Sequence, residues 1–297
     1  QLHGMLWEPE GVAVRAVLQI CHGVAEHIAR YDGFARALNE QGIVVAGHDH
    51  LGHGKSLPEG GTPVYFGQGS TWNTVVDDIY ILHQRLKQRY PDVPLCIMGH
   101  SMGSFLTRTY LIRYPGTVKA AVIMGTGWQP QAAITGGLAL ANAIAAVSGE
   151  NATSELVTEL AFGSYNKLFA PNRTKVDWLS ADESNVDDYI ADPLCGADAT
   201  VGLFRQMLHG IRFNQRQSHL RQMDREMPVL FVAGDKDPVG SCGKGVRQTY
   251  DAFRAAGMRD CTLKLYPGLR HEILNEKAYT ADITKNIEAW LLSRLEK

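Results

Sequence analysis

The stretch PLCIMGHSMGSFLTRTYLIRY, residues 94–114, changes from one kind of pattern to another at a serine between two glycines. Residues 94–98 form a short apolar run, which is typical of a buried strand, and residues 104–114 have the pattern of a helix. Between them, GHSMG matches Gly-x-Ser-x-Gly, a sharp turn that strains the backbone of its serine and leaves no room for bulky neighbours. The stretch therefore predicts strand, turn and helix, with Ser101 either a nucleophile or a helix cap.

The same alternation of strand and helix runs through both ends of the chain. The predicted strands lie in residues 16–22, 43–50, 94–100, 119–125, 228–235 and 261–268, and the predicted helices in residues 31–42, 73–90, 102–116, 244–256 and 275–294. Continuous apolar strands separated by amphipathic helices are what a parallel sheet covered on both faces requires. The pattern predicts an α/β fold with a mostly parallel, doubly wound sheet.

Residues 128–226 interrupt this alternation with a segment that has helical patterns and turns but no comparable strand. We expect residues 1–127 and 227–297 to form one core, with residues 128–226 inserted as a helical cap. The longest apolar stretch, residues 132–147, is rich in alanine and glycine and is too short to span a bilayer. We expect it to form a cap helix, with larger side chains at Ile134, Leu138, Ile144 and Val147.

The composition excludes several classes of partner. The net charge of −2 and the lack of a long charge run provide no basic surface for nucleic acid. The five cysteines are scattered without a Cys-x-x-Cys pair, so neither a disulfide framework nor a zinc site is indicated. The first residues do not resemble a signal peptide. We expect a cytoplasmic protein that needs no metal or cofactor and acts on a small neutral or amphipathic molecule.

A serine nucleophile requires a base within hydrogen-bond reach and an acid that orients the base. On a doubly wound sheet these residues follow in the order serine, acid, histidine. His271 is the histidine that follows the acidic residues of the last strands, and it lies in a loop after a predicted strand. Asp235 and Asp237 both follow the strand before it, where ligands bind in such folds. We favour Asp237, although both aspartates also suit a turn before Pro238.

Backbone N–H groups near Ser101 could stabilise an oxyanion. Met102 follows the serine at the start of a predicted helix, whose positive end adds to the effect. CHGVAEH, residues 21–27, follows the first buried strand, and its Gly23 would allow a close approach of the backbone. We therefore expect the N–H groups of Val24 and Met102 to form an oxyanion hole.

The loop HDHLGHGKS, residues 48–56, offers a different chemistry. His48, His50, His53 and Asp49 are ligand types that could bind a metal ion. No second carboxylate lies nearby in the sequence, and the glycines favour a tight turn against the nucleophile loop. We prefer the turn.

Together, these motifs resemble the monoacylglycerol lipase and lysophospholipase group of α/β-hydrolases. The resemblance rests on the order and spacing of residues 22–38, 48–56, 99–104, 234–240 and 266–276, and on a cap segment at residues 162–196. It implies Ser101 as nucleophile, Asp237 rather than Asp235 as acid, His271 as base, and the Val24 and Met102 N–H groups as oxyanion hole.

One position departs from the family pattern. The family often has glycine where this chain has Ala25, and alanine cannot adopt every conformation that glycine can. Glu26 and His27 match the family pattern, and we interpret them as residues that hold this loop and do not react. The helix at residues 132–147 would belong to the cap, where its apolar face would either contact an acyl chain or pack on other cap helices.

The sequence hypothesis is a serine carboxylester hydrolase that acts through an acyl-enzyme on a small ester, most simply monoacylglycerol or a lysophospholipid. The cap could touch a membrane surface transiently. Other chemistry on the same triad, namely acyl transfer, aminopeptidase activity or carbon–carbon bond hydrolysis, stays open, because a fold does not determine a reaction. So does a binding protein that keeps the cavity without catalysis.

Overall fold

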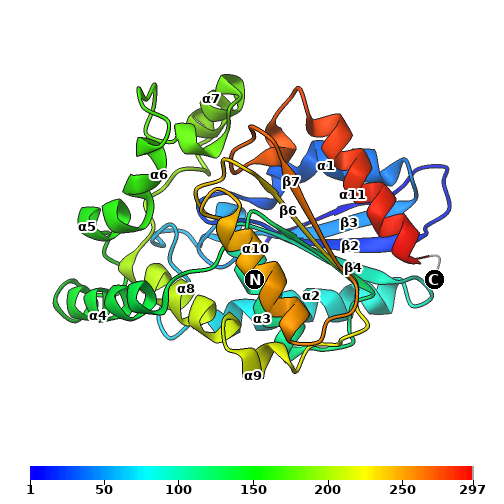
Figure 1. Cartoon of the computed structure of the whole chain (residues 1–297), viewed down its shortest axis with the longest axis horizontal. Coiled ribbons are helices and arrows are strands. Elements are labelled where there is room, and N and C mark those ends of the chain that lie inside the picture. The colour runs from blue at the N-terminus through cyan, green and yellow to red at the C-terminus, as the bar shows by residue number, and fades with distance from the viewer. Residues whose placement is uncertain (296–297) are drawn as a thin grey trace.

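The computed structural model describes residues 1–295, in which one seven-stranded sheet forms the centre of the molecule (Figure 1). The strands are β1 (Gly4–Trp7), β2 (Ala16–Cys21), β3 (Ile43–His48), β4 (Leu95–His100), β5 (Ala120–Met124), β6 (Val229–Gly234) and β7 (Cys261–Tyr266). Their order is β1-β3-β2-β4-β5-β6-β7, and only β1 runs antiparallel to its neighbour. The predicted fold class is confirmed.

Helices cover both faces of the sheet because the strands alternate between two cores. Met98 of β4 and Val122 of β5 belong to the core under α1 (Asp32–Asn39) and α11 (Thr280–Leu295). Ile97, directly before Met98, and Ile123, directly after Val122, belong to the core on the opposite face. That core lies under α2 (Trp72–Arg89), α3 (Met102–Arg113) and α10 (Lys244–Ala255). This two-residue period explains why the strands read as continuous apolar runs.

Two elements differ from the sequence prediction. The edge strand β1 was not predicted, because four residues at an edge leave little hydrophobic pattern. The last helix begins at Thr280 and not near residue 275, because the backbone of Glu276 is extended, with φ −79° and ψ 90°, and cannot continue a helix. The Glu276 side-chain Oε1 accepts the Ala181 N–H at 2.8 Å. A short 3-10 helix, η5 (Ile273–Asn275), precedes it.

The segment between β5 and β6 carries the inserted helices. They are α4 (Gln131–Ser148), α5 (Glu155–Thr158), the π-helical η3 (Glu159–Gly163), α6 (Ser164–Lys167), the 3-10 helix η4 (Asp177–Leu179), α7 (Glu183–Ala191), α8 (Val201–Asn214) and α9 (Gln217–Leu220). In Figure 1, α4 to α7 stand beside the sheet, while α8 runs back beneath it toward α3.

The helix α4 is the apolar stretch singled out in the sequence. With 18 residues, the helix is long enough and apolar enough to cross a membrane, judged by length and composition alone. The expectation that this stretch is too short to span a bilayer was therefore wrong. Ile134 and Leu138 are buried in the core that includes α8, whereas Val147 is 89% exposed. The apolar face of α4 thus packs mainly on another inserted helix.

Four histidines fill the space between the end of β2 and the loop after β3. The rings of His22 and His50 lie 4.2 Å apart between centroids, and His48 and His53 flank His50. Burial lowers the pKa of His22 and His48 to about 4 and of His53 to about 3, and it holds the pKa of His50 well below its usual range. The folded protein therefore keeps all four rings neutral at pH 7.

These four rings predict a loss of stability in mild acid. Below pH 6.5 the unfolded chain gains protons that the folded chain does not, so the free energy of unfolding should fall as pH drops from 6.5 toward 4. The limit is about 1.4 kcal/mol per pH unit for each histidine. Calorimetry at pH 7.5, 6.0 and 5.0 should show a progressive fall in Tm.

Three groups with raised pKa values, His100, Asp78 and Glu288, oppose this trend, whereas carboxylates with lowered pKa values, such as Glu26 and Glu272, add to it. The pKa of His100 is raised, because its hydrogen bond and charge interaction with Glu26 outweigh the effect of burial. Burial also lowers the pKa of His83 to about 4 and lowers the pKa of His209, so one histidine stands against six and the predicted sign is unchanged. A Tm that stays constant or rises between pH 6.5 and 5 would contradict the prediction.

Candidate active site

Ser101 lies in the turn between β4 and α3, where the sequence motif places it. Its backbone has φ 54° and ψ −123°, a conformation that L-residues rarely adopt. A Cβ at Gly99 would overlap the carbonyl oxygen of Gly103, and a Cβ at Gly103 would overlap that of Cys21. The steric need for both glycines is thus visible, and the turn holds Ser101 at the carboxyl edge of the sheet.

His271 and Asp237 face each other at the same edge. His271 Nδ1 and Asp237 Oδ1 are 3.0 Å apart, and both side chains are almost fully buried. Asp237 Oδ1 also accepts the Val239 N–H at 2.9 Å. Because the carboxylate accepts a hydrogen bond from Nδ1, the other ring nitrogen, Nε2, is free to act as a proton acceptor. It has no hydrogen-bond partner among residues 1–295.

Asp235, the other aspartate after β6, makes a different contact. Its Oδ1 accepts the Gly268 N–H at 2.8 Å, and its side chain is partly exposed. It ties the loop that follows β7 to the end of β6. His271, three residues after Gly268, is paired with Asp237 instead.

Val24 and Met102, the residues predicted to supply the oxyanion hole, each follow a residue at the serine turn: Met102 follows Ser101 itself, and Val24 follows Gly23, where a Cβ would lie 3.0 Å from Ser101 Cβ. Met102 is the first residue of α3, so its N–H has no acceptor within the helix. Val24 lines the same cavity as Ser101, whereas the Met102 side chain is buried beneath it. Within the described part of the chain, neither N–H donates a recorded hydrogen bond to a protein group.

His22 fixes the peptide that carries the Val24 N–H. Its Nε2 accepts the His50 N–H at 2.9 Å, so the proton of the neutral ring is on Nδ1, which donates to the Gly23 carbonyl at 2.7 Å. That carbonyl and the Val24 N–H belong to one planar peptide and point in opposite directions. The Gly23 N–H is also held, by Glu26 Oε1 at 2.5 Å.

A buried charge network lies behind this loop. Arg30 donates to both carboxylate oxygens of Glu272, at 2.7 and 2.8 Å, and to Glu26 Oε2 at 2.8 Å. Burial alone would raise the pKa of Glu26, but His100 and Arg30 hold it well below its usual range. The pKa of Glu272 is lowered in the same way by Arg30. Both carboxylates are therefore charged at pH 7 and anchor the residues beside Ser101 and His271.

Ser101 and His271 open into a cavity of about 910 Å³ between the sheet edge and the inserted segment. Apolar and aromatic side chains from that segment line it, among them Phe162, Trp178 and Tyr189. The Trp178 ring lies 5.2 Å from the His271 ring between centroids. The size and lining suit a small molecule with an apolar part.

The loop at residues 48–56 is built around Asp49 as a turn. The Asp49 carboxylate accepts the backbone N–H groups of Ile28 and Lys55, both at 2.8 Å. Within residues 1–295, the group that brings three metal-ligand atoms within 4.8 Å of one another is not this loop but His27, Asp192 and Cys195. The preferred interpretation of the loop as a turn therefore agrees with its contacts.

Several residues of the site were not found by sequence reasoning. Arg30, Trp178 and Tyr189 reach the site from helices or loops far from the serine in sequence, and nothing in their local patterns marks them. Glu272 had one signal, its position directly after His271. The interpretation of Glu26 as a residue that holds the loop agrees with its contact, since its carboxylate accepts the Gly23 N–H.

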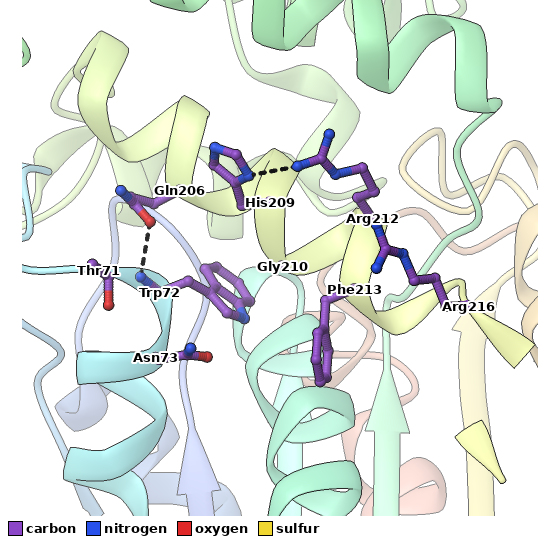
Figure 2. Close-up of a pocket in the computed structure, with 9 residues that line it drawn as sticks. All are labelled: Thr71, Trp72, Asn73, Gln206, His209, Gly210, Arg212, Phe213 and Arg216. Carbon is purple, nitrogen blue, oxygen red and sulfur yellow. Dashed lines mark hydrogen bonds between the residues drawn. The ribbon is translucent and has the colours of Figure 1, made fainter. Parts of the chain in front are cut away.

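A second cavity, of about 250 Å³, lies between the start of α2 and α8 (Figure 2). Gln206 accepts the Trp72 N–H at 3.0 Å, and the Trp72 ring donates to Thr109 at 2.8 Å. His209 and Arg212 contact each other at 3.1 Å on its other side. This second cavity shares no lining residue with the cavity at Ser101. Its lining residues come from the start of α2 and from α8, so it lies where α8 packs on the core.

Comparison with known proteins agrees with this geometry. The family model described as serine aminopeptidase, S33, matches residues 12–278. The monoacylglycerol lipase of Mycolicibacterium smegmatis is 31% identical over 98% of this chain and 92% of that protein. The mouse monoglyceride lipase is 28% identical over 97% of this chain and 86% of that protein.

A solved structure is similar over the same extent. The carboxyl esterase of Bacillus coagulans matches with a TM-score of 0.91 and 26% identity, over 98% of this chain and 94% of that chain. The resemblance found in the sequence is thus confirmed over nearly the whole length. The chain belongs to the serine aminopeptidase S33 family of α/β-hydrolases, within its monoacylglycerol lipase group.

Proposed function

We propose that the protein hydrolyses the ester bond of monoacylglycerol, or of a similar single-chain lipid ester, through an acyl-enzyme. The observation that carries the proposal is the pairing of His271 Nδ1 with buried Asp237, which leaves Nε2 free in the cavity that Ser101 also lines. A serine, an oriented imidazole and unpaired backbone N–H groups are the parts that acyl transfer requires.

In the proposed mechanism Ser101 Oγ attacks the ester carbonyl while His271 Nε2 takes its proton. The carbonyl oxygen becomes an oxyanion, which accepts hydrogen bonds from the Val24 and Met102 N–H groups. The intermediate collapses and releases the alcohol, which receives the proton from His271. Water, activated by the same imidazole, then attacks the acyl-enzyme and releases the acid. Asp237 keeps the imidazole in the required tautomer throughout.

The cavity supports a substrate with an acyl chain. Phe162, Trp178 and Tyr189 give the cavity aromatic surface, and polar residues line it as well, of which Glu155, Lys167 and Lys175 are exposed. Each methylene moved from water into such a space contributes about 0.8 kcal/mol. Two curated relatives are named as lipases of monoacylglycerol or monoglyceride, which agrees with this substrate class.

We also propose that residues 128–226 act as a cap on a core of residues 1–127 and 227–297. Large apolar side chains of this cap face solvent, with Leu156, Leu160 and Leu168 each more than half exposed. They support a transient contact of the cap with a membrane surface, from which a lipid ester would enter. The five cysteines are all free, which supports a location in the reducing cytoplasm.

Replacing Ser101 with alanine tests the nucleophile and the bond type together. The wild-type protein should hydrolyse monoacylglycerol faster than amino-acyl p-nitroanilides, and the Ser101→Ala variant should lose at least about 10⁴-fold in kcat because no acyl-enzyme can form. Far-UV circular dichroism should be unchanged. Ester hydrolysis retained by the variant, or a wild-type preference for the amide, would contradict the proposal.

The two aspartates after β6 provide a matched pair of variants. Asp237→Asn should lower kcat by about 10³- to 10⁴-fold, because the asparagine side chain stabilises the wrong imidazole tautomer. Asp235→Asn, which alters only the tie to Gly268, should stay within about threefold of wild type. Steady-state kinetics on p-nitrophenyl butyrate measures both. Equal losses in the two variants would refute Asp237 as the acid.

The membrane contact can be tested on vesicles of phosphatidylcholine. The wild-type protein should float with the vesicles in a density gradient, and the double variant Leu156→Glu and Leu160→Glu should not, because charged side chains oppose burial among acyl chains. Ile81→Glu, at an exposed position of α2, is the control and should float as wild type does. Flotation that is the same for all three proteins would rule out this cap surface.

A further inference from the structure

The backbone of Ala25 is held by the cap at the point where the proposed oxyanion loop is strained. Ala25 has φ 53°, in the left-handed region that disfavours side chains with a Cβ. Its carbonyl oxygen accepts two hydrogen bonds, from the Tyr189 hydroxyl and from the Gly196 N–H, both at 3.0 Å. Both donors belong to the inserted segment, more than 160 residues away in the chain.

The cap presents these donors because α7 ends in a tight turn. The Cys195 N–H donates to the Asp192 carbonyl at 3.0 Å, and the Leu194 N–H donates to the Asp192 carboxylate at 2.9 Å. Gly196, with φ 75°, continues from this turn toward Ala25. Tyr189 is set by the Arg30 guanidinium, which lies 5.0 Å from its ring centroid.

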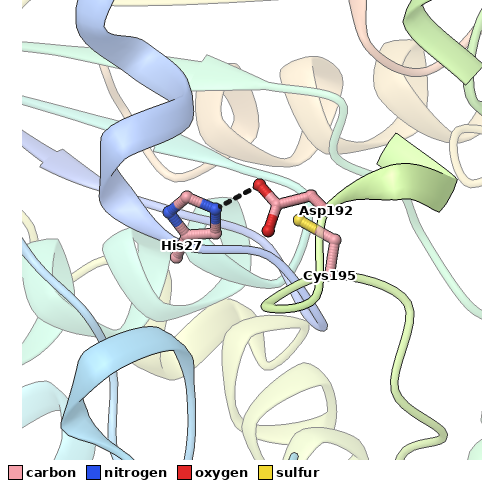
Figure 3. Close-up of side chains that lie close together, drawn as sticks. All are labelled: His27, Asp192 and Cys195. Atoms are coloured by element: carbon pink, nitrogen blue, oxygen red, sulfur yellow. Dashed lines mark hydrogen bonds and ion pairs between the residues drawn. The ribbon is translucent and has the colours of Figure 1, made fainter. Parts of the chain in front are cut away.

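A third contact joins the same two segments. His27 Nε2 and Asp192 Oδ2 lie 2.8 Å apart, and Figure 3 shows the Asp192 carboxylate directed at the His27 ring with Cys195 beside it. We use the name cap clamp for the contacts of Tyr189 and Gly196 with Ala25 and of Asp192 with His27. The cap clamp thus contacts the loop at Ala25 and His27, which both follow Val24 in the chain.

The two sides of Val24 are fixed by different parts of the molecule. On one side, His22 and Glu26 of the core hold the carbonyl and the N–H of Gly23. On the other side, the only hydrogen bonds recorded on the Ala25 carbonyl within residues 1–295 come from the cap. A strained residue relaxes unless its surroundings hold it. Release of Ala25 would therefore move the neighbouring residue Val24.

The geometry points to Tyr189 and Gly196 as positioning residues that hold the Val24 N–H in place for oxyanion stabilisation through the strained Ala25 peptide. This inference rests on the function proposed above and adds a role for the cap beyond covering the cavity. Neither residue needs to touch the reacting atoms. The cap would then determine the turnover rate as well as the access of substrate to the cavity at Ser101.

The Tyr189 hydroxyl could instead contact substrate, since Tyr189 also lines the cavity. The two roles predict different results when strain at Ala25 is removed. Glycine adopts φ 53° at little cost, so an Ala25→Gly loop should stay in place without the cap clamp. A substrate contact by the hydroxyl would be lost regardless of the residue at position 25.

The test is a double-mutant cycle of Tyr189→Phe and Ala25→Gly on p-nitrophenyl butyrate. Tyr189→Phe should lower kcat about fivefold with KM within twofold, the size of one neutral hydrogen bond. Ala25→Gly alone sets the reference rate for its own background. The double variant should recover to within twofold of Ala25→Gly. The rate of labelling by a fluorophosphonate, whose adduct carries an oxygen in the same hole, should follow kcat.

Tyr279→Phe, at an exposed position before α11, is the matched control and should equal wild type. Wild-type kcat in Tyr189→Phe, an equal fall in both Ala25 backgrounds, or a rise in KM alone would each overturn the inference. These outcomes are distinct from failure of the proposed function, in which the wild-type protein itself would not turn over the ester. Thermal unfolding of each variant shows that it is folded at the assay temperature.

Discussion

The structure depends on one backbone constraint, the left-handed conformation of Ser101 at the end of β4. An L-residue stays at φ 54° only where its surroundings are packed tightly enough to enforce it. Here the enforcement comes from Gly99 and Gly103, where any side chain would overlap backbone atoms. The close approach of Gly103 to the end of β2 brings the loop with Val24 beside the serine. The same turn starts α3, which leaves the Met102 N–H without a helical partner.

The fold could be predicted from the sequence because the strands carry a strong signal. The strands β2 to β6 are short, mostly apolar runs that are buried on both faces, so composition and burial agree. The edge strand β1 and the start of α11 could not be predicted, since the first has few buried residues and the second follows an extended backbone at Glu276 that has no sequence signal. The residues proposed as the triad could be chosen by chain order, although the choice between Asp235 and Asp237 needed the family resemblance.

The support around the triad lies beyond sequence reasoning. Arg30 bridges Glu26 and Glu272, which are 246 residues apart in the chain, and no local pattern predicts such a meeting. The departure at Ala25 was visible in the sequence, but its meaning required the structure. A residue with a Cβ stands at a positive φ, and the inserted segment supplies the hydrogen bonds that oppose its relaxation. Core and cap thus each hold one side of the same loop.

The central claim, that Ser101 is a nucleophile activated by His271, is tested most directly by covalent labelling. The protein is treated with a fluorophosphonate, digested and examined by tandem mass spectrometry. We expect one adduct per chain, on Ser101 and not on the neighbouring Ser104, and its loss in a folded His271→Ala variant. Absence of an adduct in the wild-type protein, or undiminished labelling in His271→Ala, would contradict it.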